Sequence, residues 1–210
     1  MQPEAVTETD NRSLSVQILR AIAFLLIFLS HAFGRLGWWG AFGVSLFIVL
    51  SGYLEAKHHL NDELDAKTFA KKKVKKVYPL HIVMLVLAIP LSLAILTANH
   101  GVIKLLAQIF FNVTMTQSWI PMSSIYYSLN AVSWYLTLVV FFALITPILM
   151  VWLRESTSGA ITIAIISLVI LDFLIGFLSM RFPASHWIAY VCPVTRAFDY
   201  IIGGDCPKTR

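Results

Sequence analysis

The stretch "VQILRAIAFLLIFLSHAF" at residues 16–33 decides the class of fold. Nearly all of it is apolar, and a helix of this length crosses most of the roughly 30 Å hydrocarbon core of a bilayer. Arg20 and His31 are exceptions, and their separation of eleven residues places them on one helix face, about 16 Å apart along the axis. Because ionisable groups at membrane depth are costly and commonly functional, this pair is the first candidate site.

The composition extends the membrane prediction to the whole chain. Of its 210 residues, 58% are hydrophobic and only 13% are charged. A water-soluble domain of this size could hardly bury so many apolar side chains, so we predict an integral membrane protein. The first apolar segment follows a mixed-charge tail and has no small-x-small cleavage site, so we expect it to be retained as a helix.

Further apolar segments predict an all-α, polytopic transmembrane bundle of about six membrane helices plus the start of another. The segments lie at residues 16–33, 42–54, 77–96, 102–115, 131–153 and 161–178. The segment at 102–115 either spans the membrane or re-enters on the same side. The side of the membrane on which the aromatic loop at 116–130 lies is therefore left open. Residues 196–203 resemble the first turns of another helix, but a polar stretch with Pro207 follows, so we expect a chain shortened at its C-terminal end.

A polar segment at residues 55–76 sets the expected orientation. It holds seven of the sixteen Lys and Arg residues, namely Lys57, Lys67, Lys71, Lys72, Lys73, Lys75 and Lys76. By the positive-inside rule this segment is cytoplasmic, and so is the N-terminal tail at 1–15. These lysines explain the net charge of +5, so the lipid bilayer is the expected partner and a nucleic acid is not. The two cysteines, Cys192 and Cys206, have no ligand-like spacing and predict no metal site.

Three motifs resemble those of acyltransferase family 3, whose members acylate cell-envelope glycans and other acceptors. The first is the pair Arg20 and His31, followed by "GVSLFIVLSGYL" at 43–54. The second is "FAKKKVKKVYPLHIV" at 69–83, in which Lys73 and Lys76 stand where the family typically has two arginines. The third runs from "QSWIP" at 117–121 to "SLNAVSWYL" at 128–136.

The chain departs from the family pattern at two places. Lysine keeps the charge of arginine but loses its planar bidentate fork, which weakens the transfer to Lys73 and Lys76. Many relatives also carry a carboxylate about a turn after the tryptophan, where Val139 and Val140 stand here, so no role for that acid is carried over. The resemblance places residues 16–210 in the N-terminal part of the family's transmembrane domain, which we expect to be inactive alone.

The resemblance implies an O-acetyltransferase-like enzyme of the inner (plasma) membrane that takes part in polysaccharide modification. It would move an acyl group, most simply acetyl, from cytoplasmic acyl-CoA to a hydroxyl of a cell-envelope glycan or its lipid-linked precursor. His31 is the expected general base, because the pKa of an imidazole suits proton removal near neutrality. Arg20 would contact the donor and assist catalysis. Lys73 and Lys76 would bind the donor phosphates through charge-assisted hydrogen bonds, without a metal.

Each candidate also has a structural interpretation. His31 can be a buried histidine that packs helices together, and the lysines can contact anionic lipid headgroups. Asp172, deep in the segment at 161–178, must be protonated, paired or facing a cavity, and we favour a structural polar contact. Ser133 can cap a helix, with Trp134 at the membrane interface.

The alternative function is a polysaccharide or small-molecule transporter or flippase without acyl transfer. Arg20, His31 and Asp172 would then form a proton or substrate path through the bilayer. Broken helices in matching halves of the chain would favour transport, and the sequence shows no such repeat.

Overall fold

The computed structural model describes residues 3–34, 37–96, 101–182 and 186–205. Over these residues the structure is helical and contains no strand, which confirms the all-α prediction. The chain divides into two compact units: Met1–His58 with Asp199–Arg210, and His59–Phe198. Unit 1 holds α1 (Pro3–Ala32), most of α2 (Gly37–His59) and the second half of α8 (Pro193–Gly204).

Small residues bring the helices of unit 1 close together. A Cβ at Gly43 would lie only 2.8 Å from the carbonyl oxygen of Ala23, which is itself fully buried. One turn earlier in α2, Gly40 faces the side chain of Ser30. The pairs Gly43–Ala23 and Gly40–Ser30 run in opposite directions along the chain, so α1 and α2 are antiparallel. Close backbone approach through small residues is typical of helix packing in membranes.

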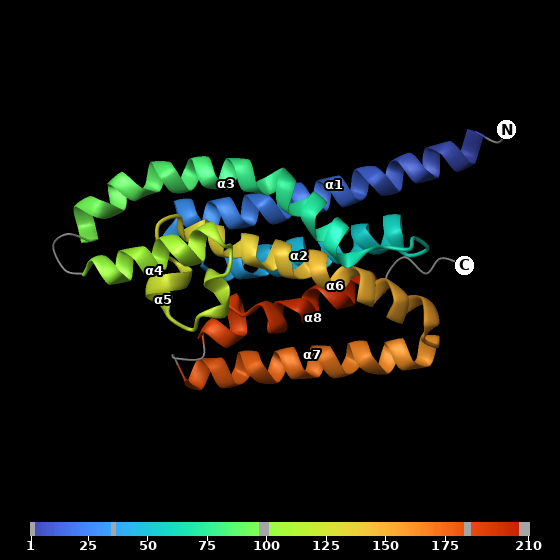
Figure 1. The fold of residues 1–210 in the computed structure, drawn as a ribbon. Helices are drawn as coiled ribbons and strands as arrows, with labels where there is room; N and C mark the ends of the chain where they lie inside the picture. The colour runs from blue at the N-terminus through green and yellow to red at the C-terminus, as the bar shows by residue number, and fades with distance from the viewer. Residues whose placement is uncertain (1–2, 35–36, 97–100, 183–185, 206–210) are drawn as a thin grey trace. The chain divides into compact units, whose positions relative to one another are not determined.

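Unit 2 is built around the antiparallel contact of α3 (Ala66–Leu96) with α6 (Trp134–Glu155) (Figure 1). Phe69 and Ala70, near the start of α3, pack against Ala143 in the middle of α6. The remaining elements of this unit are α4 (Val102–Val113), η2 (Gln117–Trp119), α5 (Ser123–Tyr126), η3 (Ala131–Ser133), α7 (Ser158–Arg181) and η5 (Trp187–Val191).

Four helical segments in the described part of the chain are long and apolar enough to cross a membrane. They are Leu14–Ala32, Gly37–His59, Ala131–Glu155 and Ser158–Arg181. The expected count of about six is not confirmed. With 12 residues, α4 is about 18 Å long and too short to span, and the first turns of α3 carry the lysine cluster.

Helix boundaries differ from the sequence prediction where polar residues flank an apolar core. The first helix begins at Pro3 instead of residue 16, and the second extends from Gly37 to His59 instead of 42–54. Apolar character decides which residues enter a bilayer, whereas polar residues continue a helix into water without difficulty. Cys206, Pro207 and the expected shortened C-terminal end lie outside the described residues.

Candidate functional site

A pocket of about 510 Å³ opens in unit 2 between the end of α2 and the first turns of α3. Lys72, Lys73 and Lys76 line its α3 side, so both predicted donor-binding lysines reach the same pocket. Asp62, Glu63 and Asp65 line it from the connecting segment. The pocket therefore has a cationic wall, suited to an anionic ligand, and an acidic rim.

The cationic wall is positioned by the N-cap of α3. Asp65 Oδ2 accepts a hydrogen bond of 2.8 Å from the backbone N–H of Thr68, which leaves one fewer unsatisfied donor at the helix start. Hydrogen bonding to Thr68 lowers the pKa of the Asp65 carboxyl, so the residue is ionised at neutral pH beside the positive end of the helix. The cap defines where α3 begins and hence which residues of its first turns face the pocket.

Phe69 forms the apolar back of the pocket. Only 8% of its surface is exposed, because it packs with Ala70 and Ala143. Lys73 Nζ lies 5.1 Å from the centroid of the Phe69 ring, and the His59 ring meets the same ring edge-on at 5.4 Å. His59 Nδ1 lies 2.7 Å from Asp62 Oδ2. Lys73 and His59 are thus held against a fixed aromatic side chain, at distances typical of cation–π and edge contacts.

Arg20 and His31 lie on α1 in unit 1, and both side chains are exposed. Because α1 is continuous, they keep the expected separation of about 16 Å along the helix. The Arg20 guanidinium carbon lies 5.2 Å from the centroid of the Phe47 ring on α2. His31 is in the last turn of α1 and makes no hydrogen bond or ion pair within the described residues. The role of these two residues as a joint candidate site stays a prediction.

Asp172 is half-buried on α7, a helix in which Ile161 is buried and most other side chains are exposed. Among the residues that the structure describes, its carboxylate has no hydrogen-bond or ion-pair partner. The favoured structural polar contact is therefore not found in this part of the chain.

The sequence analysis missed a buried polar network in unit 2 that is centred on Asn112, which is fully buried. Asn112 Nδ2 donates to Ser128 Oγ at 2.9 Å, and Asn112 Oδ1 accepts from Ser133 Oγ at 3.0 Å. The backbone oxygen of Asn112 lies 2.8 Å from Nε2 of His81, a buried residue of α3. Gln117 Nε2 donates to the backbone oxygen of Ser133 at 2.9 Å. These bonds join α3, α4 and the segment that leads into α6.

The network changes the interpretation of Ser133 and Trp134. Ser133 precedes α6, but its hydroxyl makes no capping hydrogen bond and instead donates to Asn112 Oδ1 and to the Asn130 backbone oxygen. Trp134 is only 6% exposed and packs inside the unit, so it is not an interface residue. Both structural interpretations from the sequence are wrong. The Ser133 hydroxyl bonds to Asn112, which is distant in the sequence, and to the Asn130 carbonyl in its own turn, and Trp134 is packed within the unit.

Two strained residues lie on either side of the loop that holds Gln117 and Ser128 of this network. Met115 has φ of 52° and Leu129 has φ of 59°, in a left-handed region that residues other than glycine rarely adopt. Such conformations cost about 1–3 kcal/mol each and persist where the surrounding structure determines them. The polar residues that hold this loop are scattered from 81 to 133, so sequence spacing alone gives little signal for them.

Comparison with known proteins supports the family that the sequence motifs indicate. The model of acyltransferase family 3, described as an acyltransferase domain, matches residues 13–204. The chain belongs to this family. Acyltransferase MdmB from Streptomyces mycarofaciens is 27% identical over 187 residues, which cover 78% of this chain and 45% of the relative. The chain thus spans less than half the length of that relative, and no solved structure matches it.

Proposed function

We propose that this chain carries the donor site of a membrane acyltransferase. The family match over residues 13–204 supports acyl transfer in general. The observation that carries the donor assignment is the pocket of about 510 Å³ with Lys72, Lys73 and Lys76 on one wall. The donor would be acyl-CoA, most simply acetyl-CoA, whose phosphates make charge-assisted hydrogen bonds with these lysines.

The acceptor would be a hydroxyl of a cell-envelope glycan or its lipid-linked precursor. His31 would accept the hydroxyl proton while the oxygen attacks the thioester carbonyl, and the coenzyme A thiolate would leave as the acyl ester forms. Arg20 would sit on the cytoplasmic side of His31 and contact the donor. The exposed position of His31 and its lack of a partner within the described residues leave its imidazole available for this role.

The orientation follows from the lysines. We place the lysine pocket and the N-terminus in the cytoplasm of an inner-membrane protein, by the positive-inside rule. The start of α6 then lies on the opposite side, because its 22 residues extend about 33 Å from Trp134 to Glu155, antiparallel to α3. In this arrangement α4 is re-entrant, and Arg154 lies on the cytoplasmic side.

The function is tested by transfer from labelled donor in membranes that contain the protein. We expect radiolabelled acetyl to move from acetyl-CoA to endogenous glycan, and the double variant Lys73→Ala/Lys76→Ala to raise KM for acetyl-CoA about tenfold or more. Lys75→Ala is the matched control, because Lys75 is exposed on α3 and does not line the pocket. Movement of glycan across the membrane without labelling would support the transporter instead.

A further inference from the structure

An aromatic cluster lies at the other end of unit 2 from the lysine pocket. We define it as Tyr127, Trp134, His186 and Tyr190. The His186 ring stacks on Tyr190 with centroids 5.3 Å apart, and His186 Nε2 lies 3.2 Å from Tyr127 Oη. Tyr190 in turn contacts the buried Trp134, with centroids 5.1 Å apart. Three separate segments therefore meet at one small surface that carries aromatic faces and polar tips.

The backbone beneath the cluster is unusual and firmly held. Residues Trp187–Val191 form a π-helix, a rare conformation that is frequent at functional sites. The Thr195 hydroxyl donates to the Ile188 carbonyl, and the buried Arg196 guanidinium donates to the Ala189 carbonyl. Trp187 Nε1 donates to the Ser118 backbone oxygen at 2.8 Å. These bonds fix His186 and Tyr190 before any ligand arrives.

The polar tips of the cluster are uncharged at neutral pH. Burial, and then the positive charge of Arg196, lower the pKa of His186. Burial raises the pKa of Tyr127 and that of Tyr190. A neutral imidazole and a phenol can each donate and accept hydrogen bonds, which suits a ligand with hydroxyl groups rather than an ion.

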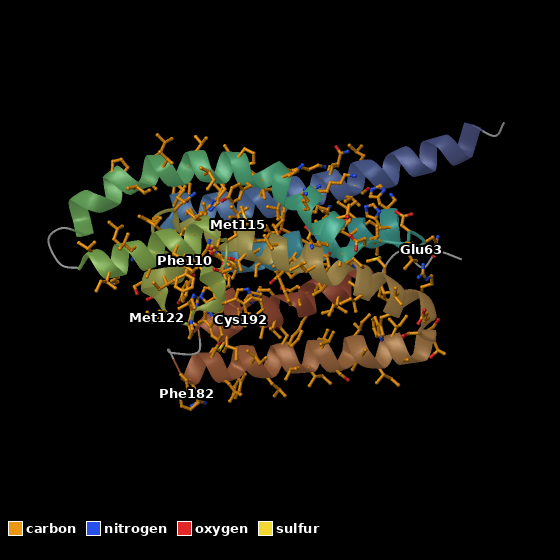
Figure 2. The ribbon with its side chains drawn as sticks, in the orientation of Figure 1. Glu63, Phe110, Met115, Met122, Phe182 and Cys192 are labelled. Atoms are coloured by element: carbon orange, nitrogen blue, oxygen red, sulfur yellow. The ribbon has the colours of Figure 1, made fainter. Side chains whose placement is uncertain are left out.

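The position of the cluster also fits a ligand from outside the cell. In Figure 2, Glu63, which lines the lysine pocket, lies far along unit 2 from Cys192 and Met122, which flank the cluster in sequence. Trp134 begins α6, at the end opposite the proposed cytoplasmic side. Exposed aromatic side chains can also anchor a protein at the membrane interface. Such an anchor would not need a buried arginine and a π-helix to hold its aromatic side chains in place.

We propose that the aromatic cluster binds a pyranose ring of the acceptor glycan. The C–H face of the sugar would pack on the exposed rings of His186 and Tyr127, with Tyr190 supporting the imidazole from behind. Its hydroxyls would exchange hydrogen bonds with the imidazole of His186 and the phenol of Tyr127. This inference rests on the proposed function for the identity of the acceptor as a glycan and for the side of the membrane on which the cluster lies.

Sugar binding is tested without any acyl donor. Cellotetraose and chitotetraose are titrated into the purified full chain in detergent, and binding is followed by saturation-transfer NMR of the sugar protons. We expect at least one of the two to bind, and Tyr190→Ala and His186→Gln to weaken its binding by about tenfold. Trp38→Ala is the control, because Trp38 is an exposed aromatic residue of unit 1.

Absence of binding by both tetrasaccharides would overturn the inference. So would Tyr190→Ala and His186→Gln proteins that bind as well as the unaltered chain. Circular dichroism of each variant shows whether its helices are intact, and His186→Gln keeps a hydrogen-bonding side chain if Tyr190→Ala fails to fold. Sugar binding without acetyl transfer would contradict the proposed function alone, whereas acetyl transfer without sugar binding would contradict the aromatic cluster alone.

Discussion

At the scale of single residues, Asn112 joins several buried polar groups of unit 2. Its side chain and backbone meet Ser128, Ser133 and His81, all of them buried. Removing one partner from a buried network leaves the others without hydrogen bonds in an apolar interior. The network is therefore sensitive to a change that leaves the hydrophobic core almost untouched.

We expect Asn112→Ala to lower the free energy of unfolding by about 2–3 kcal/mol. Thr114→Ala is the control, since Thr114 is exposed and bonds only within its own turn. Unfolding of the purified protein in mixed detergent micelles, followed by circular dichroism, measures both. Equal stability of the two variants would show that the network contributes little.

His186 makes a prediction about pH. Its pKa is lowered from the ordinary value of 6.5, so the unfolded chain binds a proton at this residue more readily than the folded chain. The residue makes no contribution to pH dependence well above pH 6.5, where both states are neutral. Stability is lost as the pH falls from 6.5 towards the lowered folded value.

NMR of protein with labelled histidine checks this directly, with His186→Gln used to assign the resonance. We expect the His186 resonance of the folded protein to titrate below pH 6.5. A midpoint at or above this value would mean that the imidazole is not influenced by burial and Arg196 as the structure indicates.

At the scale of elements, glycines govern how closely helices approach. A methyl group at Gly43 would press on the backbone of Ala23, which cannot move as a flexible side chain would. Gly176 on α7 has no neighbouring atom within 4 Å of the same position. The same substitution should therefore have opposite effects at the two sites.

We expect Gly43→Ala to destabilise the α1–α2 pair, and Gly176→Ala to stabilise α7 by about 0.5–1 kcal/mol, because alanine is the better helix former. Thermal unfolding of the two variants beside the unaltered chain gives the sign of each effect. A stabilising Gly43→Ala substitution would contradict the close approach of α1 and α2.

The start of α3 makes a second prediction at this scale. Asp65→Ala should fray the first turn and speed hydrogen exchange at the Thr68 amide, whereas Asp65→Asn should keep the cap. Since the pKa of Asp65 is lowered, its stabilising effect is present at neutral pH and lost as acid protonates the folded carboxylate. Unchanged exchange in Asp65→Ala would contradict the cap.

At the scale of the whole molecule, the sequence predicted what depends on local pattern. The long apolar segments at 131–153 and 161–178 became α6 and α7 within a few residues. Lys73 and Lys76 line one pocket, and their role in donor binding stays a prediction. The family was identified from its motifs and then confirmed.

The sequence did not predict contacts between residues that are far apart in the chain. Nothing at residues 81, 112 and 133 indicates that these side chains share hydrogen bonds, because three elements must pack before they meet. The π-helix at Trp187–Val191 also has no signal in the local sequence, because buried side chains from α8 hold it in place.

The central claim is that His31 takes the proton from the acceptor during acyl transfer. The most direct measurement is the rate of acetyl transfer from labelled acetyl-CoA in membranes that contain the protein, the His31→Ala variant or the His58→Ala variant. His58 is another exposed histidine, so it controls for loss of an imidazole. We predict that His31→Ala lowers kcat by about 10²- to 10⁴-fold while His58→Ala leaves it unchanged. Equal rates for His31→Ala and the unaltered protein would contradict the account.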